Sequence, residues 1–134
     1  MQAVLMLADW ADAINGKLYI QGGGWSSVIR SPQGQINFAI ACKIFVGWTE
    51  ANRKHEISIT LRDEDGGTYE PMPGEPFVIK SIIEVGRPAG LREGSEIDAP
   101  LALNIGGLPI VPGRYKLELS VGNNEITSVV FDVR

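Results

Sequence analysis

Residues 36–46 read Ile-Asn-Phe-Ala-Ile-Ala-Cys-Lys-Ile-Phe-Val. Apolar side chains alternate with small or polar ones, which is the period of a β-strand that buries one face. The buried face would consist of Ile36, Phe38, Ile40, Cys42, Ile44 and Val46. The other face carries Asn37, Ala39, Ala41 and Lys43, so we expect it to be the solvated side of a sheet. This stretch predicts the longest strand of the chain.

Shorter runs with the same alternation occur elsewhere in the sequence. The clearest are residues 57–62, 115–121 and 127–133. Residues 63–67 and 122–125 are rich in Asp, Asn and Gly, which favour tight turns. We expect further strands over residues 4–8, 17–21, 77–85 and 101–105, and room for one helical turn in residues 9–16.

The composition favours one all-β domain over residues 1–134. Ile and Val together number 25, and Gly and Pro together number 24, so strand formers are matched by turn formers. Turn signals recur at intervals of about 8 to 12 residues, which is typical of a sandwich or a small barrel. The count of expected strands is roughly eight, by this spacing.

The charge balance and the N-terminus bear on partners and location. Twelve Lys and Arg against sixteen Asp and Glu give a formal net charge of -4, so we expect no nucleic acid partner. The N-terminal apolar run has no basic residues before it and stops at Asp9, which is too short for a signal peptide. No apolar stretch approaches the length of a membrane helix. We expect a cytoplasmic protein, or one assembled into a virion, with no membrane partner.

Two short motifs use residue types that bind ligands elsewhere. The glycine string at residues 22–24 is followed by neither a helix nor a Lys-Ser or Lys-Thr pair, so it does not predict a phosphate-binding loop. We expect a bend or bulge there, with Trp25 packed over it. Asp63, Glu64 and Asp65 could offer oxygen ligands to a cation, but the spacing of a calcium loop is missing. A solvated hairpin turn is the simpler interpretation, and cation binding stays open.

His55 is the single histidine and Cys42 the single cysteine. One imidazole with no Cys, Ser or second His nearby in sequence defines neither a catalytic triad nor a zinc site, so we expect His55 at the surface. Cys42 lies on the apolar face of its strand, where a thiol behaves as a small buried hydrophobe. The sequence therefore predicts no catalytic, cofactor-binding or metal-binding residues, and a protein that is not an enzyme.

Trp10, Trp25 and Trp48 each lie in or beside an expected loop. Exposed tryptophans often anchor interfaces, although burial under loops is the more frequent fate of such residues. These three residues are the interface candidates of the sequence.

Three stretches together resemble a family of small, mostly actinobacterial proteins classed as a domain of unknown function. They are residues 7–12 with 16–25, residues 61–66, and residues 108–115, which read Leu-Pro-Ile-Val-Pro-Gly-Arg-Tyr. The resemblance implies an immunoglobulin-like antiparallel β-sandwich and brings no catalytic residues and no ligand. Independently of the family, Pro112-Gly113-Arg114-Tyr115 predicts a turn into a strand, with a buried Tyr115 ring whose hydroxyl bonds to nearby backbone.

These observations favour a noncatalytic module that acts through contact with another protein or with itself. A more specific version is a structural or decoration component of a phage virion or a bacterial assembly, which rests on fold analogy. The alternative from another class is a binder of a small apolar ligand or a carbohydrate, with Trp10, Trp25 or Trp48 as a stacking wall.

Overall fold

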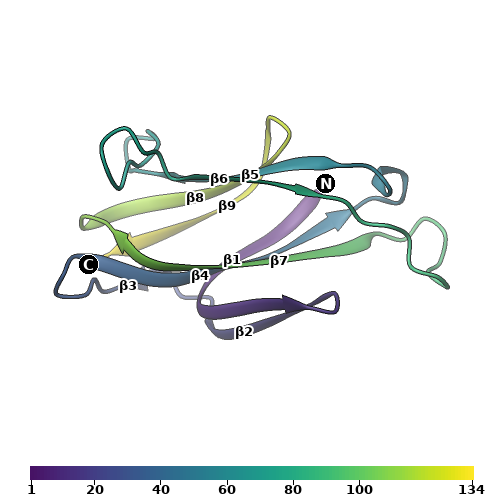
Figure 1. The fold of residues 1–134 in the computed structure, drawn as a ribbon, viewed down its shortest axis with the longest axis horizontal. Coiled ribbons are helices and arrows are strands. Elements are labelled where there is room, and N and C mark those ends of the chain that lie inside the picture. Colours follow the sequence, from purple (N-terminus) through teal and green to yellow (C-terminus); the bar gives the residue numbers. More distant parts are fainter.

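The computed structural model describes all 134 residues as two β-sheets packed face to face (Figure 1). One sheet has the order β2-β1-β4-β7 and the other the order β3-β9-β8-β5-β6. Neighbouring strands are antiparallel except for the short parallel pair of β3 and β9. The strands are β1 (Gln2–Ile14), β2 (Lys17–Gly23), β3 (Ser27–Val28), β4 (Gln35–Val46), β5 (His55–Arg62), β6 (Val78–Ile83), β7 (Ile97–Pro109), β8 (Gly113–Val121) and β9 (Asn124–Val133).

The all-β prediction is confirmed, with nine strands instead of roughly eight. Two-residue β3 has no alternating pattern of its own, and it forms only where β9 offers backbone partners. The one helical element is a single 3-10 turn, η1, over Trp48–Glu50. No helix of this structure could therefore span a membrane.

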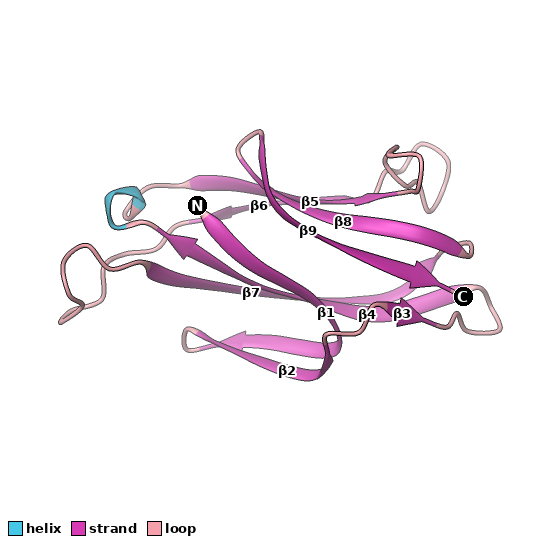
Figure 2. Cartoon of the chain, turned by 180° about the vertical axis from the view of Figure 1, so that it is seen from behind, coloured by secondary structure: helices cyan, strands magenta, loops and turns pink.

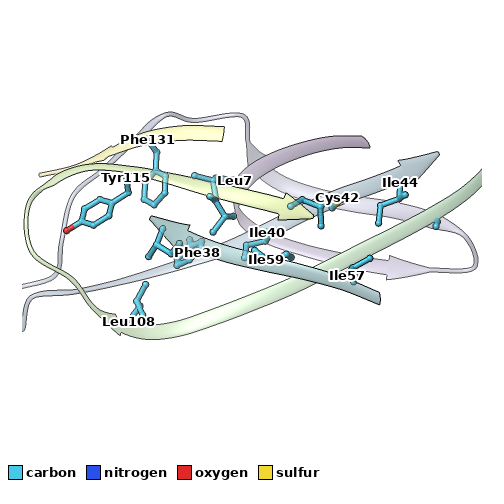
Figure 3. Packing of buried hydrophobic residues seen from close by; sticks show 14 of the residues in the cluster. Leu7, Phe38, Ile40, Cys42, Ile44, Ile57, Ile59, Leu108, Tyr115 and Phe131 are labelled. Atoms are coloured by element: carbon cyan, nitrogen blue, oxygen red, sulfur yellow. The ribbon is translucent and has the colours of Figure 1, made fainter. Parts of the chain in front are cut away.

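One core of 20 buried residues fills the space between the two sheets. The six alternating residues predicted for the inner face of β4 are all in it, each at most 2% exposed. Figure 3 shows several of them in the same layer as side chains of β5 and as Tyr115 and Phe131. The ring of Phe131 lies 6.5 Å from that of Phe38 and 5.9 Å from that of Tyr115, between centroids. The aromatic rings thus close one end of the core.

Tyr115 lies near the start of β8 and is 4% exposed. Its hydroxyl donates a 2.6 Å hydrogen bond to the backbone carbonyl of Val111, four residues upstream. Burial, with smaller contributions from Tyr69 and Asp63, raises the pKa of Tyr115 to about 12. The predicted corner is therefore present, and it fixes the turn that leads into β8.

The segment between the two N-terminal apolar runs is extended, so the expected helical turn in residues 9–16 is wrong. β1 continues through Ile14 and returns as β2 by a two-residue turn at Asn15 and Gly16. Both turn residues have positive φ, 51° and 74°. Asn-Gly is the preferred sequence for such a hairpin turn, because both residues tolerate the left-handed backbone.

The β1–β2 hairpin covers the middle of the outer face of β4, so the expectation that this face is solvated holds for Asn37 and Lys43 and is wrong for Ala39 and Ala41. β1 pairs with β4 from Gln2 to Ala8 and with β2 from Ala8 onward. Figures 1 and 2 both show the hairpin on the side of β4 and β7 that faces away from the other sheet. Ala39 and Ala41 are 0% and 1% exposed beneath it. Their small size suits close packing of this hairpin and not contact with water.

Candidate functional site

The β1–β2 hairpin carries a concentration of exposed apolar side chains. In its register Trp10 lies opposite Gln21, Asp12 opposite Tyr19, and Ile14 opposite Lys17. Directly opposed residues of antiparallel strands share a face, so Trp10, Ile14 and Tyr19 lie on the same face. They are 45%, 47% and 50% exposed. We call these three residues the hairpin face.

The opposite side of the hairpin is held to the body by small residues. Ala8 and Ala11 are both fully buried, in a cluster with Ala39 and Ala41. Because alanine side chains are short, the two backbones approach closely but bury little apolar area for each residue. The hairpin is therefore attached by a thin apolar contact.

A side-chain amide completes this attachment. Asn104 in β7 donates a 2.8 Å hydrogen bond from Nδ2 to the carbonyl of Ala11, and its Oδ1 accepts a 3.2 Å bond from the Ala11 amide. The two bonds copy the pattern that a neighbouring strand would provide. They satisfy the backbone N–H and C=O groups of Ala11, where β1 no longer pairs with β4, and they position the hairpin face.

The structure separates the three predicted tryptophans. Trp25 is partly buried and packs edge-on against Phe131, with a centroid distance of 6.4 Å. Its Nε1 is buried without a hydrogen-bond partner. Trp48 lies in η1, where the Arg87 guanidinium stacks 4.4 Å from its ring centroid and donates two hydrogen bonds to its carbonyl. Of the three, only Trp10 lies with other exposed apolar side chains on one strand pair.

The surface hollows lie elsewhere. A hollow of about 340 Å³ on the outer face of β8 is lined by nine residues, among them Arg62, Tyr115, Lys116 and Glu118. Three of its charges form one group, in which Glu118 accepts hydrogen bonds from both Arg62 at 2.9 Å and Lys116 at 3.0 Å. Burial raises the pKa of Glu118, but these two cations outweigh it and lower the pKa overall. Two further hollows border β5 and β6, and none of these three hollows is lined by a tryptophan.

The remaining candidates have structural partners. Cys42 is fully buried, and burial raises the pKa of its thiol to about 12. His55 donates from Nε2 to the carbonyl of Glu50 at 2.7 Å and is partly exposed. Oδ1 of Asp63 accepts backbone bonds from Asp65 and Gly67, both at 3.0 Å, so this carboxylate closes the turn. The structure contains no group of three or more His, Cys, Asp or Glu residues arranged to hold a metal ion.

The glycine string ends β2 and leads away from the hairpin. Gly22 has a φ of 59°, and a Cβ built there would lie 2.2 Å from the carboxylate of Asp9. Gly24 also has positive φ, at 87°. Because Gly22 has no side chain, the carboxylate of Asp9 can lie against the backbone of β2.

Sequence reasoning missed Ile14, Tyr19 and Asn104. Asn15-Gly16 was a sufficient signal for the hairpin, and the hairpin register would then have placed Ile14 and Tyr19 beside Trp10. Asn104 carries no such signal, because its partner Ala11 is 93 residues away.

Comparisons with known proteins give one family and a remote structural likeness. The chain is similar to the solved structure of the Pseudomonas fluorescens alkylpurine DNA glycosylase AlkC bound to DNA containing an abasic site analog. The likeness has a TM-score of 0.43 and 12% sequence identity, and it covers 81% of this chain and 28% of that one. This chain thus corresponds to less than a third of the glycosylase. No curated protein matches it.

The DNA in that complex overturns the prediction that nucleic acid is excluded as a partner. Net charge averages over the whole surface, so a value of -4 does not exclude a local contact with phosphates. At this TM-score the likeness carries no argument for a DNA-binding role.

The family comparison covers nearly the whole sequence. The model of a family described as "Family of unknown function (DUF6941)" matches residues 3–134. The matched range includes the hairpin, both sheets and the corner at Tyr115. The chain therefore belongs to this family of unknown function, DUF6941.

Proposed function

We propose that this protein is an immunoglobulin-like β-sandwich module that acts by contact with another protein or with itself and catalyses no reaction. The observation that carries the proposal is the hairpin face, with Trp10, Ile14 and Tyr19 each about half exposed on one side of a strand pair. Tryptophan and tyrosine are enriched among the residues that dominate binding energy at protein interfaces.

The sheet orders support the immunoglobulin-like part of the proposal. In that fold, strands A, B and E are neighbours in one sheet and strands C, F and G in the other. β1, β4 and β7 correspond to the first set, and β5, β8 and β9 to the second. The Tyr115 hydroxyl bond at the start of β8 matches the tyrosine corner of strand F. β2 is an addition to this plan, which places the hairpin face outside the common fold.

The thin attachment of the hairpin supports a role in contact. A strand pair that served only stability would turn its large apolar side chains toward the body. Here the fully buried residues of the body side are alanines, and Leu18 and Ile20 on the same side stay partly exposed, whereas Trp10 and Tyr19 face outward. Covering the outward side with a partner would remove this apolar surface from water.

The first experiment measures native mass by light scattering on a size-exclusion column over a wide range of concentration. We expect the wild type to exceed the mass of one chain at high concentration and the double variant Trp10→Ser, Tyr19→Ser to remain at one chain. Ile29→Ser is the matched control, because Ile29 is 67% exposed but lies outside the hairpin. An equal effect of the control would show that general surface hydrophobicity, and not the hairpin face, drives association.

A monomeric wild type would exclude self-assembly and direct the test to a different protein. A photo-crosslinking side chain would then replace Trp10 in the source organism, with position 29 as the control. An adduct formed at position 10 and not at 29 supports the proposal. A monomer that forms no adduct at position 10 refutes it.

A further inference from the structure

The sandwich is open along the side where β6 and β7 form the edges of the two sheets. β6 ends the five-stranded sheet and β7 ends the four-stranded sheet. Figure 1 shows both strands along the near side of the molecule, and Figure 2 shows them together on the far side. No strand bridges them, so the inner layer reaches the surface here.

A crevice of about 220 Å³ lies between these two edges. Its walls are inward-facing side chains of β5, β6 and β7 together with Lys80 from the outer face of β6, and five of its seven lining residues are hydrophobic. We call it the flank crevice; its lining residues are Ile57, Ile59, Ile79, Lys80, Ser81, Leu101 and Leu103. Pockets that enclose a whole drug-sized molecule have volumes of about 300 to 1,000 Å³, so this crevice suits a few apolar side chains better than a complete small ligand.

The backbone of β6 has free hydrogen-bonding groups beside the crevice. The Leu61 amide donates to the Phe77 carbonyl at 3.1 Å, which sets the alternation of the β5–β6 ladder. Residues 79 and 81 therefore direct their backbone groups toward β5, and Lys80 and Ile82 direct theirs away from it. The N–H and C=O groups of Lys80 and Ile82 are thus available to an added strand.

The two edges differ in how they resist pairing. β7 contains Pro100 and Pro109, and proline interrupts the donors of an edge. β6 contains no proline, and its exposed residues include Ile82, which is 59% exposed. Lys80 is its one charged residue, and Lys80 takes part in none of the five ion pairs of the structure. β6 is therefore the less protected edge.

We propose that the edge of β6 binds an extended segment of a partner protein by strand addition, with alternate aliphatic side chains of that segment in the flank crevice. The backbone groups of Lys80 and Ile82 would supply the ladder, and Ile79, Leu101 and Leu103 would contact the inserted side chains. Recognition of this kind draws affinity from main-chain hydrogen bonds and specificity from alternate side-chain pockets.

The other face of the added strand has a different chemistry. Val78, Lys80 and Ile82 lie on the outer face of β6, opposite Thr60, Ser58 and Glu56 of β5. An acidic residue of the partner would pair with Lys80, and a neighbouring apolar residue would cover Ile82. The occupant is therefore a segment that alternates aliphatic residues with at least one Asp or Glu. This site is separate from the hairpin face, so either proposal can fail alone.

The test pans a phage-displayed library of random dodecapeptides on the full chain, with the Ile82→Pro variant as the counter-selection. The Ile82 amide faces away from β5, so proline there removes the edge donor and keeps the native ladder. We expect enriched peptides to alternate aliphatic and acidic residues. Ile82→Thr, which keeps the amide and trims the apolar side chain, is the matched control.

Affinity of the enriched peptides then decides the role of each group. We expect Ile82→Pro and Lys80→Glu each to weaken binding by at least about tenfold, and Ile82→Thr to weaken it far less. A peptide with Lys in place of its acidic residue should recover binding to Lys80→Glu. Amide chemical shifts of Lys80 and Ile82 should move when peptide is added. A failure to enrich any alternating sequence, or unchanged affinity for Ile82→Pro, would overturn the proposal.

Discussion

Large side chains fill the apolar contact between the two sheets, whereas small side chains form the apolar contact beneath the β1–β2 hairpin. Between the sheets, large side chains such as Phe38, Leu117 and Phe131 interlock at 0% to 1% exposure. Between the hairpin and the β4–β7 pair, the contact consists mainly of alanines, with Met6 beside them and one asparagine amide from β7. The large residues of the hairpin face point outward instead.

This difference separates stability from recognition. Burial of a large side chain contributes about 1.5 to 3 kcal/mol, so the inter-sheet core accounts for most of the stability. Alanines contribute less for each residue but allow the hairpin to lie close and in one orientation. The hairpin thus presents Trp10 and Tyr19 without their being needed for the core.

The strongest test of the comparison removes an aromatic ring from the core. Phe131→Ala should destabilise the fold by about 3 to 5 kcal/mol, because the cavity left among Phe38, Trp25 and Tyr115 cannot close. Urea unfolding followed by circular dichroism measures the loss. The neighbouring Val130→Ala, at a 49% exposed position, should stay within about 0.5 kcal/mol. Similar losses from both would contradict the assignment of the core.

The alanine contact between the hairpin and β4 is tested by placing a larger side chain in it. Ala41→Leu should cost about 1 to 3 kcal/mol, because the hairpin leaves no room for the added carbons. The readout is urea unfolding, together with limited proteolysis of the hairpin. Ser128→Leu, on the exposed outer face of β9, controls for a new leucine on a strand. A neutral Ala41→Leu would mean that water, and not the hairpin, covers this face.

The amide attachment should have a smaller and more local effect. Asn104→Ala removes both hydrogen bonds to Ala11, each worth about 0.5 to 1.5 kcal/mol. Hydrogen exchange of the Ala11 amide should become faster, while exchange in β4 changes little. Gln21→Ala lies on the same hairpin and makes no side-chain hydrogen bond, so it serves as the control. Unchanged exchange at Ala11 would show that the alanines alone hold the hairpin.

The smallest expected effect is a pH dependence on the outer face of β8. The pKa of Glu118 is lowered in the folded protein, so its stabilising effect is present above its unfolded pKa of about 4.3 and is lost as the pH falls through the folded value. In Glu118→Gln, the loss of stability between neutral and acidic pH should therefore be smaller than in the wild type by less than about 1 kcal/mol. The effect is small because the contacts of Glu118 with Arg62 and Lys116 are partly solvated.

Stability measured at neutral pH and at pH values below the unfolded pKa checks this expectation. Glu93→Gln is the control, because Glu93 takes part in none of the five ion pairs. If Glu118→Gln and the wild type lose the same free energy of unfolding at acidic pH, the pH dependence belongs to other carboxylates.

Local patterns predicted a large part of the fold and little of the candidate site. Alternation marked the inner face of β4, and Pro-Gly before Tyr115 marked the corner, because both depend on residues close in sequence. Asn15-Gly16 is a hairpin signal, but the absence of alternation in residues 9–16 favoured a helical turn, which the structure does not contain. Trp10 was among three candidates that sequence could not rank, since exposure depends on what packs above each ring.

The sequence by itself determined an all-β chain, the inner face of its longest strand and the tight turns at residues 63–67 and 122–125. These follow from side-chain period and from the φ values that Gly and Asn allow. Only the tertiary structure decided that the hairpin folds over Ala39 and Ala41, that Asn104 holds it, and that β6 and β7 leave the flank crevice open. Those features depend on contacts between residues far apart in the chain, and no local period encodes them.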